Sequence, residues 1–343
     1  MSNLLLIGNF LSSKGLGYSV IEDLAEKLKK AGFGVFKASS YASGWLRAAH
    51  MIYITIRYHN QYELAVIDLF SGKAFFWGEA VAYILSFFKK PFIFVLRGGA
   101  LPDFSQRHPN LVKTCLKKAV KVVAPSDYLA EKMRLYRNDL ISISNPIDVA
   151  KYNFGLRQNL KSKLVWMRAF HKIYNPSLAP KVISILKRDF SDICLIMVGP
   201  NKGDGSLEET QEEALRLGVK DNVSFAGAAS KKEVPVWLNR GDIFINTTNV
   251  DNTPISVIEA MACGLCVVST NVGGIPYLLK HEEDALLVPP NDPTAMATAI
   301  RRILIDPNLA ERLSINARKK AERFDWSEIL PQWEALFESM VEQ

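Results

Sequence analysis

The chain has 343 residues, of which 48% are hydrophobic and 22% charged, a composition that excludes a largely disordered protein. No run of about 18 uncharged apolar residues occurs, and the N-terminus lacks the basic start and cleavage site of a secretory signal, so we predict neither a membrane span nor export. The net charge is +7, and the four cysteines lie in apolar or helical contexts, which favours a reducing, cytoplasmic location without disulfides.

Short apolar runs alternate with amphipathic stretches along the first half of the chain, as is typical of parallel α/β proteins. Strands are predicted at 4–7, 34–38, 51–55, 64–68, 92–96, 120–124 and 140–144. Helices are predicted at 17–31, 73–88, 110–118 and 126–136. After the first strand, Gly15 and Gly17 would let the backbone approach a phosphate or sugar, although the loop is neither a dinucleotide fingerprint nor a Walker motif.

Positive charge is concentrated in the first half of the chain. Residues 1–155 contain 20 Lys and Arg against 11 Asp and Glu, whereas residues 156–343 contain 22 against 24. Such a field attracts nucleic acid, a lipid diphosphate or an anionic bilayer, or it reflects only solvated helix faces. The stretch 73–88 is apolar nearly all round, which indicates a helix packed within the domain or one that lies on a membrane before Lys89 and Lys90.

A second α/β series follows the Pro- and Gly-containing segment 145–155, which we interpret as a linker. Its strands are predicted at 164–168, 194–198, 223–226, 243–246, 266–269 and 285–288, and helices at 293–305, 309–323 and 327–341. We therefore expect two doubly wound Rossmann-like domains, residues 1–150 and 151–326, facing each other across a cleft.

Two positively charged residues open the second series. Arg168 ends an apolar strand, where a guanidinium can bind a diphosphate with two parallel hydrogen bonds. The alternative is a structural ion pair. Lys172 would add a second positive charge, or it lies at the surface.

The segment from Asp251 to Gly264 places two carboxylates, Asp251 and Glu259, on either side of a predicted helix start. Pro254 suits the first helical position, Thr253 can cap the helix, and Gly264 can close it. Helix N-termini attract anions and carboxylates accept hydrogen bonds, so a nucleotide sugar would fit. The alternative is that Glu259 is an ordinary surface residue.

The run Glu259-Ala-Met-Ala-Cys-Gly264, with the acid at position 251, the pair Gly273-Gly274 and the segment 285–293, resembles the retaining glycosyltransferases of family four, which have the GT-B architecture. The resemblance covers about residues 160–330. It implies that the terminal segment 327–343 returns to the first domain.

The resemblance also implies roles for the site residues. Glu259 would bind the donor's ribose, Asp251 the transferred sugar, and Arg168 the diphosphate leaving group. The Gly15/Gly17 loop would face the donor phosphate from the first domain. The backbone that would meet the sugar or diphosphate belongs to Thr253, Pro254, Ile255 and Ser256.

The chain departs from the family pattern at three points. The first acid is Asp251 rather than the usual Glu. Arg168 and Lys172 lie four residues apart rather than five, so Lys172 need not take the family lysine's place. Arg97-Gly98-Gly99 stands where the family often has His-Gly or His-Asp, and Arg97 would contact an anionic acceptor there.

We therefore expect an enzyme that transfers a hexose-type sugar from a UDP- or GDP-sugar to a glycan or lipid-linked acceptor, in surface polysaccharide, lipopolysaccharide or glycolipid synthesis. The expected enzyme needs no obligatory metal, binds no nucleic acid, and contacts the inner membrane face peripherally. The alternatives are a catalytically silent nucleotide-sugar binding protein and a glycoside hydrolase that uses Asp251 and Glu259.

Overall fold

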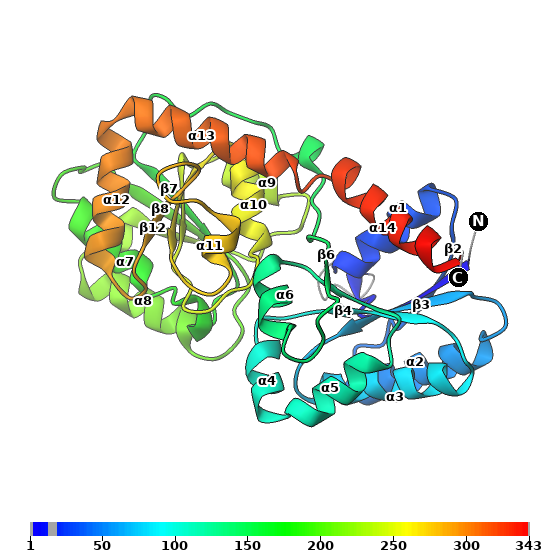
Figure 1. The fold of residues 1–343 in the computed structure, drawn as a ribbon. Helices are drawn as coiled ribbons and strands as arrows, with labels where there is room; N and C mark the ends of the chain where they lie inside the picture. Colours follow the sequence, from blue (N-terminus) through cyan, green and yellow to red (C-terminus); the bar gives the residue numbers. More distant parts are fainter. Residues whose placement is uncertain (1–2, 13–18, 342–343) are drawn as a thin grey trace. The chain divides into compact units, whose positions relative to one another are not determined.

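The computed structural model describes residues 3–12 and 19–341, so the predicted glycine contacts at Gly15 and Gly17 lie outside the described residues. The chain divides into two compact units (Figure 1). Unit 1 comprises residues 1–146 and 327–343, and unit 2 comprises residues 147–326. The predicted domain boundary falls four residues after the boundary between the units.

Unit 1 is built on a parallel six-stranded sheet with the strand order β2-β1-β3-β4-β5-β6. Both neighbours of β1 pair with it in parallel, so that Ile7 lies opposite Ala38 on one side and Ile67 on the other. The direction of strand addition reverses between β1 and β3, and ligands of doubly wound folds bind at the carboxyl ends of such strands. The strands are β1 (Asn3–Ile7), β2 (Gly34–Ala38), β3 (Leu64–Leu69), β4 (Phe92–Leu96), β5 (Lys121–Ala124) and β6 (Ile141–Ser142).

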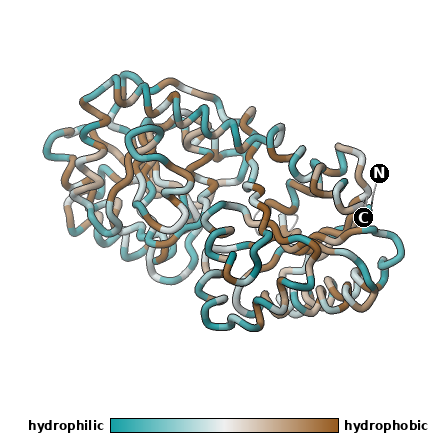
Figure 2. The backbone as a smooth tube through the Cα atoms, viewed as in Figure 1, coloured by the Kyte–Doolittle hydropathy of each residue, from teal (hydrophilic) through white to brown (hydrophobic). Residues whose placement is uncertain are grey.

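Helices cover both faces of this sheet (Figure 1). One hydrophobic core joins side chains of α2 to α6 with those of the strands, and Figure 2 shows the strands as the most hydrophobic part of the backbone. On the other face, the terminal helix α14 packs Phe337 edge-on against Phe33, with ring centroids 6.0 Å apart. The helices are α1 (Val20–Lys30), α2 (Gly44–Arg57), α3 (Lys73–Phe87), α4 (Leu101–Arg107), α5 (Pro109–Lys117), α6 (Asp127–Met133) and α14 (Trp326–Val341).

The strand predicted at 51–55 is wrong, because these residues lie in the middle of α2. Their β-branched side chains favour a strand locally. In the folded unit, however, Ala48, Met51 and Thr55 are buried at helical spacing, so packing against the sheet overrides local propensity. Helix α4 was not predicted at all.

Unit 2 contains a second parallel sheet with the order β12-β11-β10-β7-β8-β9. Strands β7 and β10 are adjacent at its centre, with Leu164 opposite Ile243. The sheet also reverses direction here, so the segments after β7 and β10 meet at its carboxyl edge. The strands are β7 (Lys163–Met167), β8 (Cys194–Val198), β9 (Val223–Gly227), β10 (Ile243–Asn246), β11 (Cys266–Thr270) and β12 (Leu286–Val288).

Two hydrophobic cores bury the two faces of this second sheet. Helices α7, α8 and α12 contribute to one core, whereas α9, α10 and α11 contribute to the other. The α-helices of unit 2 are α7 (Leu178–Leu186), α8 (Ser206–Arg216), α9 (Val234–Leu238), α10 (Ile255–Ala262), α11 (Ile275–Leu278), α12 (Pro293–Ile305) and α13 (Pro307–Glu322). Short 3₁₀ helices are η2 (Val149–Lys151), η3 (Lys172–Tyr174) and η4 (Lys220–Asn222).

The two doubly wound α/β folds are confirmed, while the expected cleft between them stays a prediction. Within residues 3–12 and 19–341, no helix combines the length and apolar character needed to cross a bilayer.

Candidate functional site

Arg168 and Asp251 come together at the centre of the unit 2 sheet. Arg168 directly follows β7, and Asp251 lies in the loop between β10 and α10. Arg168 Nη2 donates a hydrogen bond of 2.6 Å to Asp251 Oδ2, and both side chains are largely buried. Burial raises the pKa of Asp251 above its usual range, and the Arg168 guanidinium opposes that shift. The alternative of an ion pair for Arg168 is therefore confirmed, and its partner, Asp251, is itself one of the predicted site residues.

The guanidinium of Arg168 is not fully engaged by this ion pair. It lies 4.0 Å from the centre of the Tyr174 ring, a cation–π contact that orients its plane. Its Nε is buried without a hydrogen-bond partner. Buried polar groups are rarely left unpaired, and those that are often mark a ligand or functional site. Arg168 therefore retains a donor for a further acceptor.

Glu259 is buried inside α10, with 8% of its surface exposed, so the surface alternative is wrong. The hydroxyl of Tyr152 donates a 2.7 Å hydrogen bond to Glu259 Oε1. Burial raises the pKa of Glu259 to about 7, and this shift is opposed by Tyr152, Lys231 and Arg168 in that order. An additional hydrogen-bond donor would strongly stabilise the charged form of this buried carboxylate, because few donors surround it.

The start of α10 differs from its prediction. The N-cap residue is Pro254, whose side chain cannot accept a hydrogen bond, and the helix begins at Ile255. The expected Thr253 cap and the expected first helical position of Pro254 are therefore both wrong. No hydrogen bond of the Ile255 or Ser256 amide is found among the described residues. The Ser256 hydroxyl is also buried without a partner. The helix thus presents unused donors at its positive end, which is a favourable place for an anion.

The glycines of the motif hold the loop in place. Gly264 has a φ of 78° and closes α10 as predicted, with the Leu265 amide donating to the Ala260 carbonyl at 3.1 Å. The Gly274 amide donates to the carbonyl of Asp251 at 3.0 Å. A Cβ atom on Gly273 would collide with the same carbonyl. The Gly273-Gly274 pair therefore packs against the loop that carries Asp251.

Lys172 lies two residues before Tyr174, whose ring contacts Arg168, and its own role at the site stays a prediction. Lys172 opens η3, its amide donates to Asp204 Oδ2 at 2.8 Å, and its side chain is exposed. Within the described part of the chain its side chain forms neither a hydrogen bond nor an ion pair. The lysine that acts electrostatically on Glu259 is Lys231, in the segment between β9 and α9.

In unit 1, Arg97 directly follows β4 and is buried. Its Nε donates to Asp68 Oδ1 at 2.7 Å and its Nη1 donates to Asn145 Oδ1 at 2.6 Å. Gly98 has a φ of 87°, and a Cβ atom on Gly98 or Gly99 would have no other atom within 4 Å. Arg97 therefore has internal partners, while the two glycines form an open turn beside it.

A cavity of about 320 Å³ lies at the carboxyl ends of β1 and β3, where the strand order of unit 1 reverses. Its lining combines polar and aromatic side chains. Arg47 is held there by hydrogen bonds to Asn9 Oδ1 at 2.8 Å and to the Tyr41 carbonyl at 2.9 Å. The lining residues used below are Asn9, Arg47, Asp68, Ser71 and Trp77. This cavity was missed in the sequence because α2, which supplies Arg47, was not predicted.

Three side chains that shape the unit 2 site were also missed. Tyr152 lies in the segment interpreted as a linker, Tyr174 in the short helix η3, and Lys231 in the segment between β9 and α9. No motif marked them. In the described ranges, no group of three or more His, Cys, Asp and Glu side chains is placed to hold a metal ion. The expectation of no obligatory metal stays a prediction.

Residues 153–320 match the family model of glycosyl transferases group 1. The chain is 32% identical over 136 residues to a D-inositol 3-phosphate glycosyltransferase of Streptomyces bingchenggensis, covering 39% of this chain and 30% of that protein. It is 25% identical over 209 residues to one of Jonesia denitrificans, covering 58% of this chain and 49% of that protein. The chain thus matches about a third to a half of the length of these relatives.

The fold is similar to those of solved structures over nearly the whole chain. Sucrose-phosphate synthase of Thermosynechococcus elongatus matches with a TM-score of 0.80 and 19% identity, covering all of both chains. Anabaena HepE, in complex with UDP and glucose, matches with a TM-score of 0.76 and 18% identity, covering 99% of this chain and 100% of that one. Residues 153–320, just under half of the chain, therefore match glycosyl transferases group 1, and the chain has the GT-B fold.

Proposed function

We propose that the chain transfers a hexose-type sugar from a nucleotide diphosphate sugar to an acceptor hydroxyl, with retention of anomeric configuration. The observation that carries this proposal is the grouping in unit 2 of a partly engaged Arg168, a buried Glu259 and an α10 start with unused donors. Together these groups can bind the ribose hydroxyls, the diphosphate and the transferred sugar of such a donor.

Glu259 is the group that we assign to the ribose. Two vicinal hydroxyls can donate hydrogen bonds to one carboxylate, and the Tyr152 hydroxyl is the only side-chain hydrogen-bond donor to Glu259 within the described ranges. New donors would stabilise its charged form and offset the cost of its burial. HepE binds UDP and UDP-glucose in its solved structures, which supports a UDP-sugar as the donor here.

We assign the diphosphate to the start of α10 and to Arg168. The amides of Ile255 and Ser256, together with the Ser256 hydroxyl, can donate to phosphate or sugar oxygens, and Thr253 and Pro254 shape the backbone before them. Asp251 is held by Arg168 and accepts from the Asn252 amide at 2.9 Å, which orients it toward sugar hydroxyls. Lys231, rather than Lys172, supplies the second positive charge in this proposal.

Transfer breaks the bond between the sugar C1 and the β-phosphate oxygen, and the diphosphate leaves with the bonding electron pair. The acceptor oxygen forms the new bond to C1, and its proton passes to the departing phosphate. Negative charge therefore builds up on the phosphate in the transition state. A fixed guanidinium and a helix N-terminus stabilise that charge without reorganising, which is an efficient form of catalysis.

We place the acceptor in unit 1, in the cavity beside β1 and β3. Trp77 offers a flat apolar surface for a sugar ring, and Asn9, Asp68 and Ser71 offer hydrogen-bonding groups around it. Gly98 and Gly99, in the turn after Arg97, would let an acceptor approach the backbone. Such an acceptor is a glycan or a lipid-linked saccharide, as in the synthesis of surface polysaccharide, lipopolysaccharide or glycolipid.

A thermal-shift screen of UDP-, GDP- and ADP-sugars on the full chain tests the donor, followed by turnover assays with saccharide acceptors. We expect one base to stabilise the protein markedly, because a ligand that binds only the folded state raises its stability. Donor binding without turnover on any acceptor would favour the silent binding protein. Stabilisation by no nucleotide sugar would contradict the proposal.

A further inference from the structure

The outward face of α2 is apolar and unusually exposed. Trp45 is 82% exposed, Tyr53 58% and Ile56 44%, and these positions repeat at helical spacing opposite the buried face. The helix contains no Asp or Glu, and Arg57 ends it. Single exposed apolar side chains are common, but a row of large ones along one helix is not.

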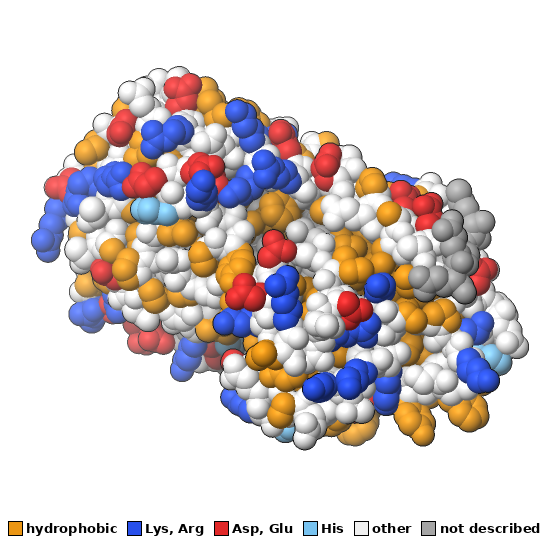
Figure 3. All heavy atoms as spheres, in the orientation of Figure 1, with side chains coloured by type: hydrophobic (Ala, Val, Ile, Leu, Met, Phe, Trp, Pro, Cys, Tyr) orange, Lys and Arg blue, Asp and Glu red, His pale blue; other side chains and the backbone are white. Residues whose placement is uncertain are grey.

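Helix α3 packs beside α2 and continues the same surface. Its inner side chains are buried in the unit 1 core, whereas Phe76, Tyr83 and Phe87 are 51%, 67% and 78% exposed. Glu79 is the only acidic residue on either helix. In Figure 3, hydrophobic side chains protrude from unit 1 along the edge where Figure 1 places α2 and α3.

Positive charges border this aromatic surface. Lys118 Nζ lies 5.2 Å from the centre of the Tyr83 ring, which joins the end of α5 to the outer face of α3. Lys89 follows the C-cap residue Phe88 of α3, and Arg57 is the last residue of α2. Lys90 is instead turned to the Tyr62 carbonyl, to which it donates at 3.0 Å. The aromatic side chains and the lysines therefore belong to one continuous surface of the layer that contains α2, α3 and α5.

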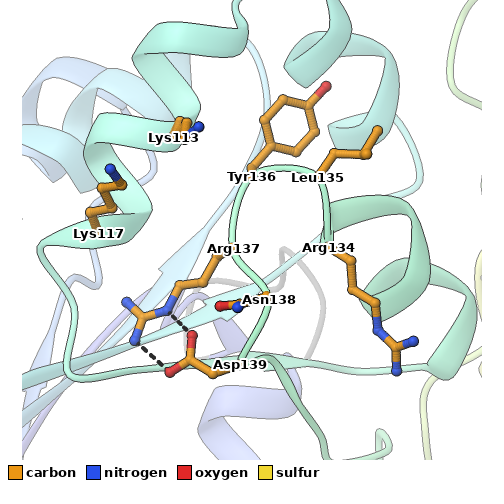
Figure 4. A pocket seen from close by; sticks show the side chains of 8 residues that line it. All are labelled: Lys113, Lys117, Arg134, Leu135, Tyr136, Arg137, Asn138 and Asp139. Atoms are coloured by element: carbon orange, nitrogen blue, oxygen red, sulfur yellow. Dashed lines mark hydrogen bonds and ion pairs between the residues drawn. The ribbon is translucent and has the colours of Figure 1, made fainter.

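Beyond Lys118, the same layer contains a basic cavity of about 390 Å³ (Figure 4). Lys113 and Lys117 approach it from α5, and Arg134 lies in the turn after α6. None of these three forms an ion pair within the part of the chain that the structure describes. Arg137, by contrast, forms an ion pair with Asp139 at 2.6 Å and donates hydrogen bonds to backbone carbonyls.

We propose that the outer surface of α2, α3 and α5 is a docking surface for an anionic lipid bilayer. The aromatic side chains enter the headgroup region, where amphipathic rings are favoured, and the lysines and Arg134 bind lipid phosphates. Charge complementarity favours this occupant over a protein. Lys113, Lys117 and Arg134 form no ion pair within the described residues, and Asp139, the acid that lines the cavity, is paired with Arg137. Glu79 is the only acidic residue on α2, α3 and α5. The proposal does not depend on the activity proposed above.

The test is co-sedimentation of the full chain with vesicles of phosphatidylcholine alone and of phosphatidylcholine with about a third phosphatidylglycerol. We expect binding to the anionic vesicles only, weakening as salt rises from 0.1 to 0.5 M by charge screening. The double variant Lys113→Gln/Lys117→Gln should bind roughly 25-fold more weakly, at about fivefold per neutralised charge. Trp45→Ala/Phe87→Ala should bind at least about tenfold more weakly.

Matched controls are Leu215→Ala, which removes an exposed apolar side chain of unit 2, and Lys319→Gln, which removes an exposed charge there. Both should bind vesicles like the unaltered chain, and thermal unfolding should show that every variant folds. Absence of binding to anionic vesicles at 0.1 M salt would overturn the proposal. A dimer in solution that Trp45→Ala/Phe87→Ala dissociates would also overturn it, because the surface would then be a protein interface.

Discussion

Donor affinity should fall as the pH is lowered through 7, because Glu259 must be charged to accept hydrogen bonds from ribose hydroxyls. In the free protein, burial raises the pKa of Glu259 to about 7. Ribose hydroxyls would favour the charged form, so donor binding lowers this pKa and expels the remaining proton. The dependence arises from the free protein's titration and not from the donor, whose diphosphate diester does not titrate near neutral pH.

The expected size follows from that pKa. With a pKa of about 7, about nine-tenths of Glu259 is protonated at pH 6 and about one-tenth at pH 8. If only the charged form binds, the Kd rises about tenfold between pH 8 and pH 6. A Tyr152→Phe variant removes a hydrogen bond that lowers the pKa of Glu259, so the whole profile should move to higher pH.

Calorimetric titration of UDP-glucose between pH 6 and pH 8 measures this dependence. Glu259→Gln should bind weakly at every pH and lose the slope, because its side chain does not titrate. Glu212→Gln is a matched control, since Glu212 is exposed on α8 of the same unit. A slope that survives in Glu259→Gln, or a Kd independent of pH in the unaltered chain, would refute the reasoning.

Three further predictions concern the same unit. Arg168→Ala should lower turnover by roughly 10²-fold, whereas Arg302→Ala, at an exposed position, should leave turnover unchanged. If the alanine variant misfolds, Arg168→Lys keeps a positive charge beside Asp251. Normal turnover in both folded Arg168 variants would remove Arg168 from the mechanism. The pKa of Glu259 in the folded protein, about 7, exceeds its ordinary value of 4.5, so keeping this carboxyl buried costs stability increasingly as the pH rises from 4.5 to 7. Glu259→Gln should therefore raise the free energy of unfolding, measured in urea, by about 3 kcal/mol at pH 8 and by little at pH 5. Gly273→Ala should destabilise unit 2, because it adds a Cβ at a φ of 53° against a carbonyl, and an unchanged urea midpoint would contradict the packing role.

The fold of both units follows largely from hydrophobic patterning. Buried parallel strands such as β4 and β10 appear as short apolar runs, which the sequence reveals directly. The segment 51–55 shows the limit of that signal. A run of β-branched residues became part of α2, because the spacing of Ala48, Met51 and Thr55 fits the sheet surface, and that surface exists only in the folded unit.

The site could be predicted in part for a related reason. Arg168 and Asp251 lie in segments that follow strands, and Glu259 lies within α10 in a run of small and apolar residues, so residue type and position indicate their chemistry. Tyr152 donates to a carboxylate 107 residues away, and such a contact leaves no local pattern. The Thr253 cap failed because a capping residue is recognised by type, whereas the helix start depends on how the Asp251 loop packs against Gly273.

The most direct test of the central claim is a crystal structure of the full chain with UDP-glucose bound. The account predicts that both ribose hydroxyls lie within hydrogen-bond distance of the Glu259 carboxylate, and that the diphosphate contacts Arg168 and the amides at the start of α10. A nucleotide bound elsewhere in unit 2, with Glu259 contacting only Tyr152, would contradict it.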